Sequence, residues 1–177
     1  MPRILRENVQ PPREGWSRWE KAIVPDRHLR GRYERRRRGQ EGVMNKKIRR
    51  VLHNEMNKCG IYEWQARGFF IGQPNAVVVY VGSTCRANPG SLRDRILEYC
   101  KNGAHKSAII NKALQRGYEL WVRVKTSGRS SDRSRKTAGN MENKLLQKYD
   151  YAWNLQNNGK TSIREILPDK PGQYRDT

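Results

Sequence analysis

Acidic residues are scarce in this sequence. It contains 17 Asp and Glu against 37 Lys and Arg, which gives a formal charge of +20 at pH 7. A balance of this kind predicts a polyanionic partner.

Long apolar runs are absent as well. No stretch approaches the ~20 consecutive apolar residues that a membrane-spanning helix requires, and no apolar segment follows the charged residues at the start of the sequence. A membrane protein and a secreted protein with a signal peptide are therefore not expected. We expect an intracellular protein with no membrane partner.

Cysteine is rare too. Cys59, Cys85 and Cys100 include no Cys-x2-Cys pair, which argues against a zinc finger or RING site. Their odd number agrees with a reducing compartment, and we expect all three to be buried packing residues. No histidine stands three or four residues from a cysteine or from another histidine, so a metal cluster of these residues is not expected.

Apolar residues make up only 35% of the chain and concentrate between residues 59 and 167. This distribution predicts a basic N-terminal arm and helix over residues 1–57, a globular domain over residues 58–167, and a loose tail over residues 168–177. Trp16 and Trp19 would pin the arm. Apolar spacing over residues 43–56 predicts a helix with a buried stripe and a basic outer face.

Basic residues gather in two regions, residues 26–57 and residues 127–136. The run of four arginines that begins at Arg35 is compatible with a nuclear import signal or with a phosphate-binding patch, and the sequence does not separate them. The candidate nucleic-acid-binding residues are Arg35, Arg36, Arg37, Arg38, Lys46, Lys47, Arg49, Arg50, Arg129, Arg133, Arg135 and Lys136.

Within the globular domain three stretches have strand character: residues 59–64, 76–81 and 118–125. A long hairpin connection containing Gly68, Gly72, Pro74 and Asn75 is expected between the first two. Helices are expected after an N-cap at Ser91, from Ser107 to Gly117, and after a cap at Asn140, with a mobile basic loop over residues 126–137. Three strands with helices layered against them predict a small α/β domain.

Arg95 is the first candidate site residue. It shares a helical stripe with Leu92 and Tyr99, at spacings of three and four residues, so an apolar anchor holds it at the rim of a cleft. A guanidinium there can bind a phosphate through two hydrogen bonds and offset negative charge. An ordinary surface arginine is the alternative.

Glu142 is the second candidate. It follows Asn140 by two residues, so we expect it in the first turn of a helix, where a carboxylate also stabilises the helix dipole. Asp132 is the only other acidic residue between Ser127 and Lys148. A lone carboxylate in such basic surroundings suits a magnesium site, because magnesium completes its shell with water and phosphate oxygens.

Tyr62, Tyr80 and Asn154 complete the set. A phenol has an unperturbed pKa of ~10, so it acts as a base at neutral pH only where cations lower that pKa. Arg95, neighbouring lysines and a bound metal would have to supply this effect. Asn154 would hold the cleft together.

These residues resemble those of the GIY-YIG nucleases. The strings Gly60-Ile61-Tyr62 and Tyr80-Val81-Gly82 are followed, in order, by Arg95, Tyr99, Glu142 and Asn154. Each tripeptide alone is a weak signal, but the ordered set is strong. Residues 59–64 and 149–154 resemble most closely a plant branch that includes effector-of-transcription and HIGLE proteins.

The resemblance implies a three-stranded antiparallel sheet flanked by helices and one divalent metal ion, Mg²⁺ or Mn²⁺, bound by Glu142. It further implies that Arg95 stabilises the pentavalent phosphate, that Tyr62 is the general base or orients the water, and that Tyr80 orients water or phosphate. Tyr99 stands where many members carry histidine, and the connection from Gly82 to Ser91 is longer than in compact members.

Three interpretations follow. The favoured one is a metal-dependent endonuclease that hydrolyses DNA, and possible targets extend to RNA. The second is a nuclear nucleic-acid-binding regulator or scaffold, with other nuclear proteins as partners and little or no nuclease activity. The third is a general RNA-binding protein whose tyrosines are structural. An intact set of two tyrosines, an arginine and a glutamate favours the enzyme, since a binding protein needs no lone carboxylate in a basic cleft.

Overall fold

The structure is a computed structural model that describes residues 4–5, 15–25, 42–55, 57–70, 73–85, 91–101 and 106–154. The arginine run from Arg35 to Arg38 and the expected tail over residues 168–177 lie outside the described residues. No helix in the described part of the chain is long and apolar enough to cross a membrane.

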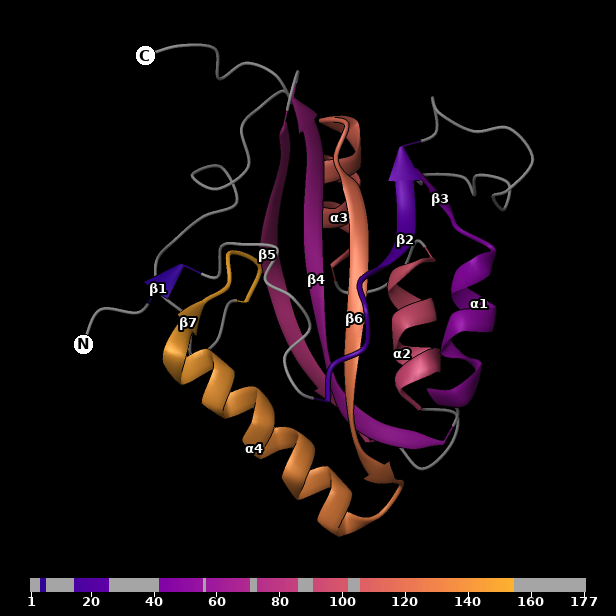
Figure 1. The fold of residues 1–177 in the computed structure, drawn as a ribbon, viewed down its shortest axis with the longest axis vertical. Coiled ribbons are helices and arrows are strands. Elements are labelled where there is room, and N and C mark those ends of the chain that lie inside the picture. Colours follow the sequence, from indigo (N-terminus) through magenta and orange to yellow (C-terminus); the bar gives the residue numbers. More distant parts are fainter. Residues whose placement is uncertain are drawn as a thin grey trace.

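A five-stranded antiparallel sheet forms the centre of the molecule (Figure 1). The strand order is β3-β2-β6-β4-β5, and the strands are β2 (Glu20–Pro25), β3 (Gly42–Met44), β4 (Lys58–Phe70), β5 (Gln73–Thr84) and β6 (Glu119–Arg129). A separate parallel pair joins β1 (Ile4–Leu5) to β7 (Tyr149–Asp150).

The expected count of three strands is wrong because the N-terminal segment contributes two more. β2 pairs with β6 and β3 pairs with β2, so this segment extends the same sheet that contains β4, β5 and β6. Ala22, Ile23 and Val24 are buried in β2. Their burial explains why this stretch pairs with the sheet although the proline-rich sequence around it indicated an extended arm.

The hairpin of β4 and β5 is longer than the sequence indicates. The two strands pair from Gly60 opposite Thr84 to Phe70 opposite Gln73. Gly68, Pro74 and Asn75 therefore lie in paired strands and not in a long connection. Gly72 lies outside the described residues.

Helices cover both faces of the sheet (Figure 1). On one face α1 (Lys47–Val51), α2 (Leu92–Tyr99) and α3 (Ser107–Gln115) pack on the larger core. On the other, α4 (Asp132–Lys148) packs with Val78, Val81 and Tyr151. The α/β layering expected from the sequence is confirmed, and so is the N-cap of α2, where the Ser91 hydroxyl accepts a hydrogen bond from the Asp94 backbone.

The expected basic loop over residues 126–137 is not a loop. β6 continues to Arg129, and α4 begins at Asp132 with Ser131 as its N-cap. Asn140 is therefore inside α4 and does not cap it, and Glu142 lies in the middle of the helix, away from the favourable dipole of its first turn. Buried Ser134 and Ala138 dock this part of α4 on the sheet.

The N-terminal tryptophans do hold their segment in place. The rings of Trp16 and Trp19 flank the guanidinium of Arg123, whose Cζ lies 4.4 and 4.7 Å from their centroids. That guanidinium forms a fully buried ion pair with Glu63, its neighbour across the strands. The pair is also held by the Tyr151 hydroxyl, which donates to Glu63 Oε1 at 2.7 Å.

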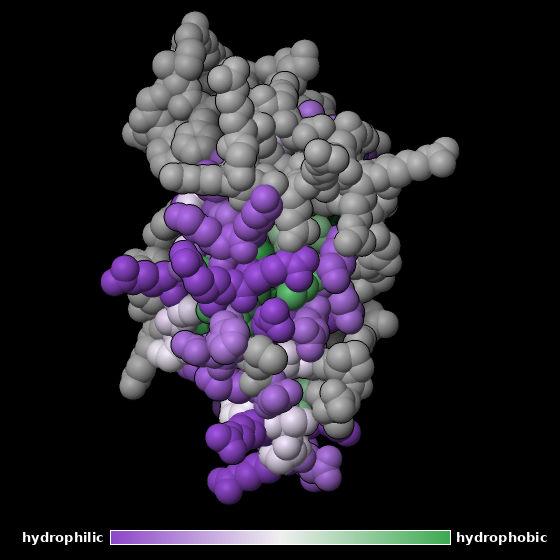
Figure 2. Space-filling view, turned by 90° about the vertical axis from the view of Figure 1, so that its right-hand side faces the viewer, coloured by the Kyte–Doolittle hydropathy of each residue, from purple (hydrophilic) through white to green (hydrophobic). Residues whose placement is uncertain are grey.

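The expected basic helix is short but oriented as the sequence predicts. Ile48 and Leu52 are buried, whereas Lys46, Lys47 and Arg50 are exposed. Val51, expected in the buried stripe, is 41% exposed. Figure 2 shows the side of the molecule on which α1 lies in Figure 1, and the described part of this face is mostly hydrophilic.

The cysteines differ from expectation. Cys59 and Cys85 form a disulfide between the start of β4 and the end of β5, with Cα atoms 4.4 Å apart. Cys100 is buried and is not part of a disulfide. The sequence hid this pairing because the partners become neighbours only through the register of the β4–β5 hairpin.

Candidate active site

Three tyrosine hydroxyls form a continuous chain between the sheet and α2. The Tyr62 and Tyr99 oxygens are 3.2 Å apart, and Tyr99 donates to Tyr80 over 3.2 Å. Their ring centroids lie 5.8 to 6.2 Å apart in tilted arrangements. The structure therefore brings together three of the residues identified in the sequence, from β4, β5 and α2.

Arg95 extends this chain at its Tyr62 end. Its Nε donates to the Tyr62 hydroxyl at 3.4 Å, and its Cζ lies 5.0 Å from the centroid of the Tyr99 ring. Its Nη1 also donates to Glu98 Oε2 at 2.6 Å, one turn further along α2. A phosphate bound by Arg95 would have to share the guanidinium with this carboxylate.

Burial dominates the electrostatics of the phenols. It raises the pKa of Tyr62, and the neighbouring Tyr80 raises it further, while the hydrogen bonds that Tyr62 shares with Tyr99 and Arg95 lower this pKa in part. Burial is also the largest cause of the raised pKa values of Tyr80 and Tyr99. The cationic effect expected to lower the Tyr62 pKa is present but smaller than burial, so the three hydroxyls are protonated at neutral pH.

Glu142 approaches from α4 on the opposite face, at the edge strand β5. Its Oε2 accepts a hydrogen bond of 2.5 Å from the Ser83 hydroxyl. Burial raises the pKa of Glu142, and hydrogen bonds from the hydroxyl and the backbone of Ser83 lower it in part. The carboxylate is thus half-buried, oriented and next to the strand that carries Tyr80.

Strand β5 links the tyrosine group to Glu142. The charge of Glu142 is close enough to contribute to the raised pKa of Tyr80. Between Tyr80 and Gly82, the side chain of Asn154 binds both backbone groups of Val81, accepting from its N–H at 3.1 Å and donating to its carbonyl at 2.9 Å. Tyr62, Tyr80, Tyr99 and Arg95 therefore contact one another. Glu142 and Asn154 bind the neighbouring residues Ser83 and Val81 of β5 instead.

Three residues of the site, Ser83, Glu98 and Lys106, are not indicated by the sequence motifs. Lys106 is 8% exposed, donates from Nζ to the Trp153 carbonyl at 2.6 Å, and lies 5.2 Å from the centroid of the Tyr80 ring. Ser83 directly follows the string Tyr80-Val81-Gly82, so its position next to this motif could have identified it. Nothing in the sequence around Lys106 indicates burial.

A family model for GIY-YIG domain-containing proteins matches residues 16–167. The chain belongs to the GIY-YIG family. Neither the curated proteins nor the solved structures gave a significant match. The match confirms the superfamily indicated by the two strings, and membership indicates a nuclease with a nucleic-acid partner.

Glu142 is the residue of this GIY-YIG site that could hold a metal ion. Among the described residues, no three His, Cys, Asp or Glu side chains come together. Glu142, oriented by the neighbouring hydroxyl of Ser83, fits an ion such as Mg²⁺, which binds one or two protein carboxylates and fills its shell with water and phosphate oxygens.

The candidate nucleic-acid-binding residues that the structure describes form two separate groups in this GIY-YIG domain. Lys46, Lys47, Arg49 and Arg50 belong to α1 or to its cap. The other group, Arg129, Arg133, Arg135 and Lys136, occupies the end of β6 and the first turns of α4 and is exposed.

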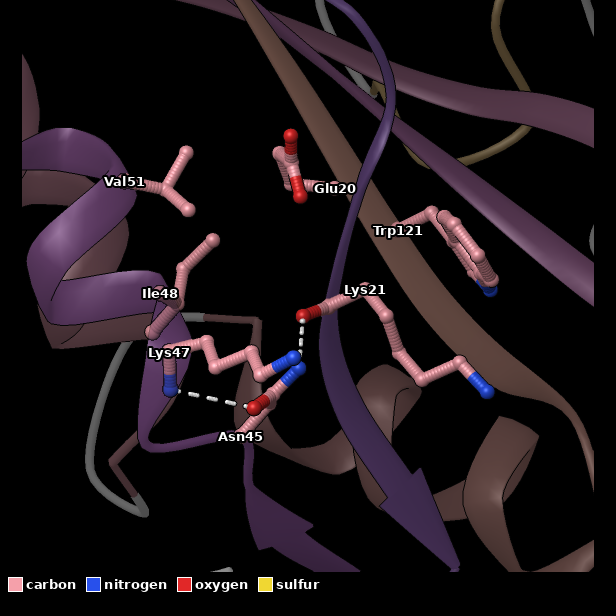
Figure 3. A pocket seen from close by; sticks show the side chains of 7 residues that line it. All are labelled: Glu20, Lys21, Asn45, Lys47, Ile48, Val51 and Trp121. Carbon is pink, nitrogen blue, oxygen red and sulfur yellow. Dashed lines mark hydrogen bonds between the residues drawn. The ribbon is translucent and has the colours of Figure 1, made fainter. Parts of the chain in front are cut away.

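A pocket of about 260 Å³ opens beside α1 (Figure 3). Its walls include Lys21, Lys47 and Trp121, and the Asn45 side chain bridges two backbone groups within it, with bonds of 3.0 Å to Lys21 and Lys47. None of the six candidate catalytic residues lines this pocket.

Proposed function

We propose that this GIY-YIG protein is a metal-dependent endonuclease that hydrolyses phosphodiester bonds of DNA. The observation that supports it best is the hydrogen-bonded group of Arg95 and three tyrosines beside a strand whose outer edge holds an oriented carboxylate. A structural tyrosine cluster would not need Glu142 held in place by Ser83.

Each residue has a role that its position supports. Arg95 binds the phosphate and offsets the charge that develops on it during hydrolysis. Glu142 holds the metal ion, which when bound supplies a Lewis acid for phosphate oxygens. Asn154 fixes β5 between the two groups.

We propose that the phenols orient water and phosphate as neutral hydrogen-bonding groups. With its pKa raised by burial, Tyr62 is a poor base in the free protein. The donors run from Arg95 through Tyr62 and Tyr99 to Tyr80, which leaves the Tyr80 hydroxyl proton for a phosphate oxygen or a water. The role of Tyr62 as orienting group is therefore favoured over its role as base.

Plasmid DNA incubated with Mg²⁺, with Mn²⁺ and with chelator tests the proposal. We expect nicking that the chelator stops. Glu142→Ala should abolish nicking and retain DNA binding, and Tyr62→Phe should slow nicking strongly. Nicking at the native rate by Glu142→Ala would show that Glu142 is not the metal ligand. A salt-sensitive gel shift without nicking would support the binding-protein alternative instead.

We also propose a narrower family assignment and a nuclear location. The strings at residues 59–64 and 149–154 support the plant branch of effector-of-transcription and HIGLE proteins, and the arginine run beginning at Arg35 supports a nuclear location. In a reducing nucleus we expect Cys59 and Cys85 to be thiols, since such compartments keep disulfides reduced.

A further inference from the structure

We propose that a line of residues on α4 guides one strand of the nucleic acid into the site, with Arg135 as phosphate contact and Gly139 as the point of close approach. This inference rests on the proposed function, because it places the cleavage point at Glu142. We call Arg135, Gly139 and Glu142 the α4 track.

Helix geometry puts the three residues of the α4 track on one side. Arg135 precedes Glu142 by seven residues, which is close to two full turns, or about 10 Å along the axis. Gly139 lies between them, one turn before Glu142. At a rise of about 3.4 Å per nucleotide, 10 Å corresponds to about three steps along a duplex strand.

Arg135 is available for a phosphate. Its side chain is 61% exposed, and its only described ion pair is a distant one of 3.8 Å to Asp132, whose side chain is 92% exposed. Exposed pairs of this kind contribute little to stability. A phosphate can therefore replace the carboxylate at little cost, and an arginine can bind it through two hydrogen bonds.

Gly139 is unusual because nothing in its own packing requires glycine. A Cβ built on it meets no atom within 4 Å, and its backbone is helical. Glycine inside a helix is destabilising relative to alanine. An open helical surface one turn from the candidate metal ligand is what close approach of a phosphate backbone would use.

The opposite side of α4 supplies a matched control. Arg133 precedes Glu142 by nine residues, or two and a half turns, so it lies on the far side of the helix from the α4 track. It is exposed like Arg135 and carries the same charge. The sequence alone treats the two arginines alike, whereas the helix separates them.

Binding in chelator tests the α4 track without turnover. A short labelled DNA duplex, the same single strand and an RNA duplex would be titrated with the whole protein over a range of salt concentrations. We expect Arg135→Gln to weaken duplex binding about tenfold and to reduce the log–log salt slope by about one. Arg133→Gln should change the affinity less than twofold. Equal losses at the two positions would overturn the proposal.

Gly139→Gln tests the close approach, with Asn140→Gln on the outer side of α4 as control. We expect Gly139→Gln to raise the midpoint of thermal unfolding and to weaken binding several-fold, whereas Asn140→Gln leaves binding unchanged. An unchanged affinity in a folded Gly139→Gln protein would overturn this part of the α4 track.

Two further outcomes separate related ideas. Polyglutamate could displace the labelled duplex as well as unlabelled DNA does, and its own binding could weaken equally in Arg135→Gln. The surface would then accept any polyanion, and the assignment to phosphate would be overturned. If Arg135→Gln binds DNA as tightly as the native protein and the native protein nicks plasmid DNA, the α4 track is overturned and the endonuclease is not. An Arg135-dependent affinity in a protein that never nicks would support the α4 track and contradict the endonuclease.

Discussion

A Cβ placed on Gly82 would lie 2.6 Å from the hydroxyl oxygen of Tyr62 and 2.7 Å from its Cζ. The two residues stand opposite each other in the pairing of β4 with β5. The phenol ring of Tyr62 therefore passes over the one position of β5 that has no side chain. Gly82, which ends the string Tyr80-Val81-Gly82, therefore leaves room for the ring of Tyr62, which ends the string Gly60-Ile61-Tyr62.

Gly82→Ala should displace the Tyr62 ring and separate its hydroxyl from Tyr99. We expect a loss of about 1–3 kcal/mol in the free energy of unfolding, as for other overpacked cores, together with a large loss of nicking. Urea unfolding measures the first effect. Gly139→Ala is the control: its new methyl group meets open space, so we expect a gain of about 0.5–1 kcal/mol. In a protein that already carries Tyr62→Ala, Gly82→Ala should cost less stability. An equal cost there would show that the contact with the Tyr62 ring does not cause the loss.

Ser83→Ala should move the acid side of the pH–rate profile to higher pH. The hydroxyl lowers a pKa that burial raises, so its removal lets the pKa of Glu142 rise further, and the ionised ligand forms only at higher pH. More Mn²⁺ should then be needed for half-saturation at a given pH, measured by direct metal binding. Ser83→Thr keeps a hydroxyl and should behave like the native protein. An unshifted profile with native Mn²⁺ affinity would contradict this role.

The same shift makes a prediction for stability. Because the fold raises the pKa of Glu142, the folded state favours the protonated acid, so this contribution to stability is present at low pH and is lost as pH rises through the folded pKa. Glu142→Gln should therefore stabilise the protein at neutral pH more than in acid. Thermal unfolding at two pH values measures the difference, and an equal change at both would contradict it.

Lys106→Met should loosen the segment that carries Asn154. The variant keeps the apolar stem but leaves the Trp153 carbonyl without its ammonium donor, at a cost of about 1–3 kcal/mol. We expect faster hydrogen exchange at the Val81 N–H, which donates to Asn154, and a fall in kcat greater than the change in KM. Lys144→Met, on the exposed surface of α4, is the control. Unchanged exchange at Val81 would show that Lys106 does not position this segment.

Arg123→Met should be strongly destabilising, because it leaves the Glu63 carboxylate buried without its cation. Breaking a buried ion pair typically costs about 3–5 kcal/mol. The double variant with Glu63→Gln should recover part of the loss in urea unfolding. Arg135→Met removes an exposed partner and should cost close to nothing. A double variant less stable than Arg123→Met alone would contradict this account.

The sequence predicted the tyrosine group because its members follow short, local strings. Gly60-Ile61-Tyr62 and Tyr80-Val81-Gly82 lie in apolar strands, and Arg95 and Tyr99 share a stripe on a helix whose Ser91 cap is visible in the sequence. Family likeness supplied the order in which these pieces belong. The α/β layering followed from the same apolar patterns.

The sequence failed where structure does not depend on apolar residues. Residues 126–129 form a strand through backbone pairing with residues 58–60, at the start of β4. The first turns of α4 bury only the small side chains of Ser134 and Ala138. The many Ser, Arg and Lys residues of this stretch therefore led to the wrong prediction of a loop. Glu142 was assigned to the right helix but to the wrong turn.

Asn154 has a consequence for the protein's solubility. β5 is one of the two edge strands of the sheet. Trp153 and Asn154 form hydrogen bonds with backbone groups of Val79 and Val81 along its open side. An unprotected strand of this kind is a template on which a second chain can add. A chain cut after Asp150 would expose a run of valines there, so we expect such a fragment to self-associate and precipitate even though every tyrosine of the site is still present.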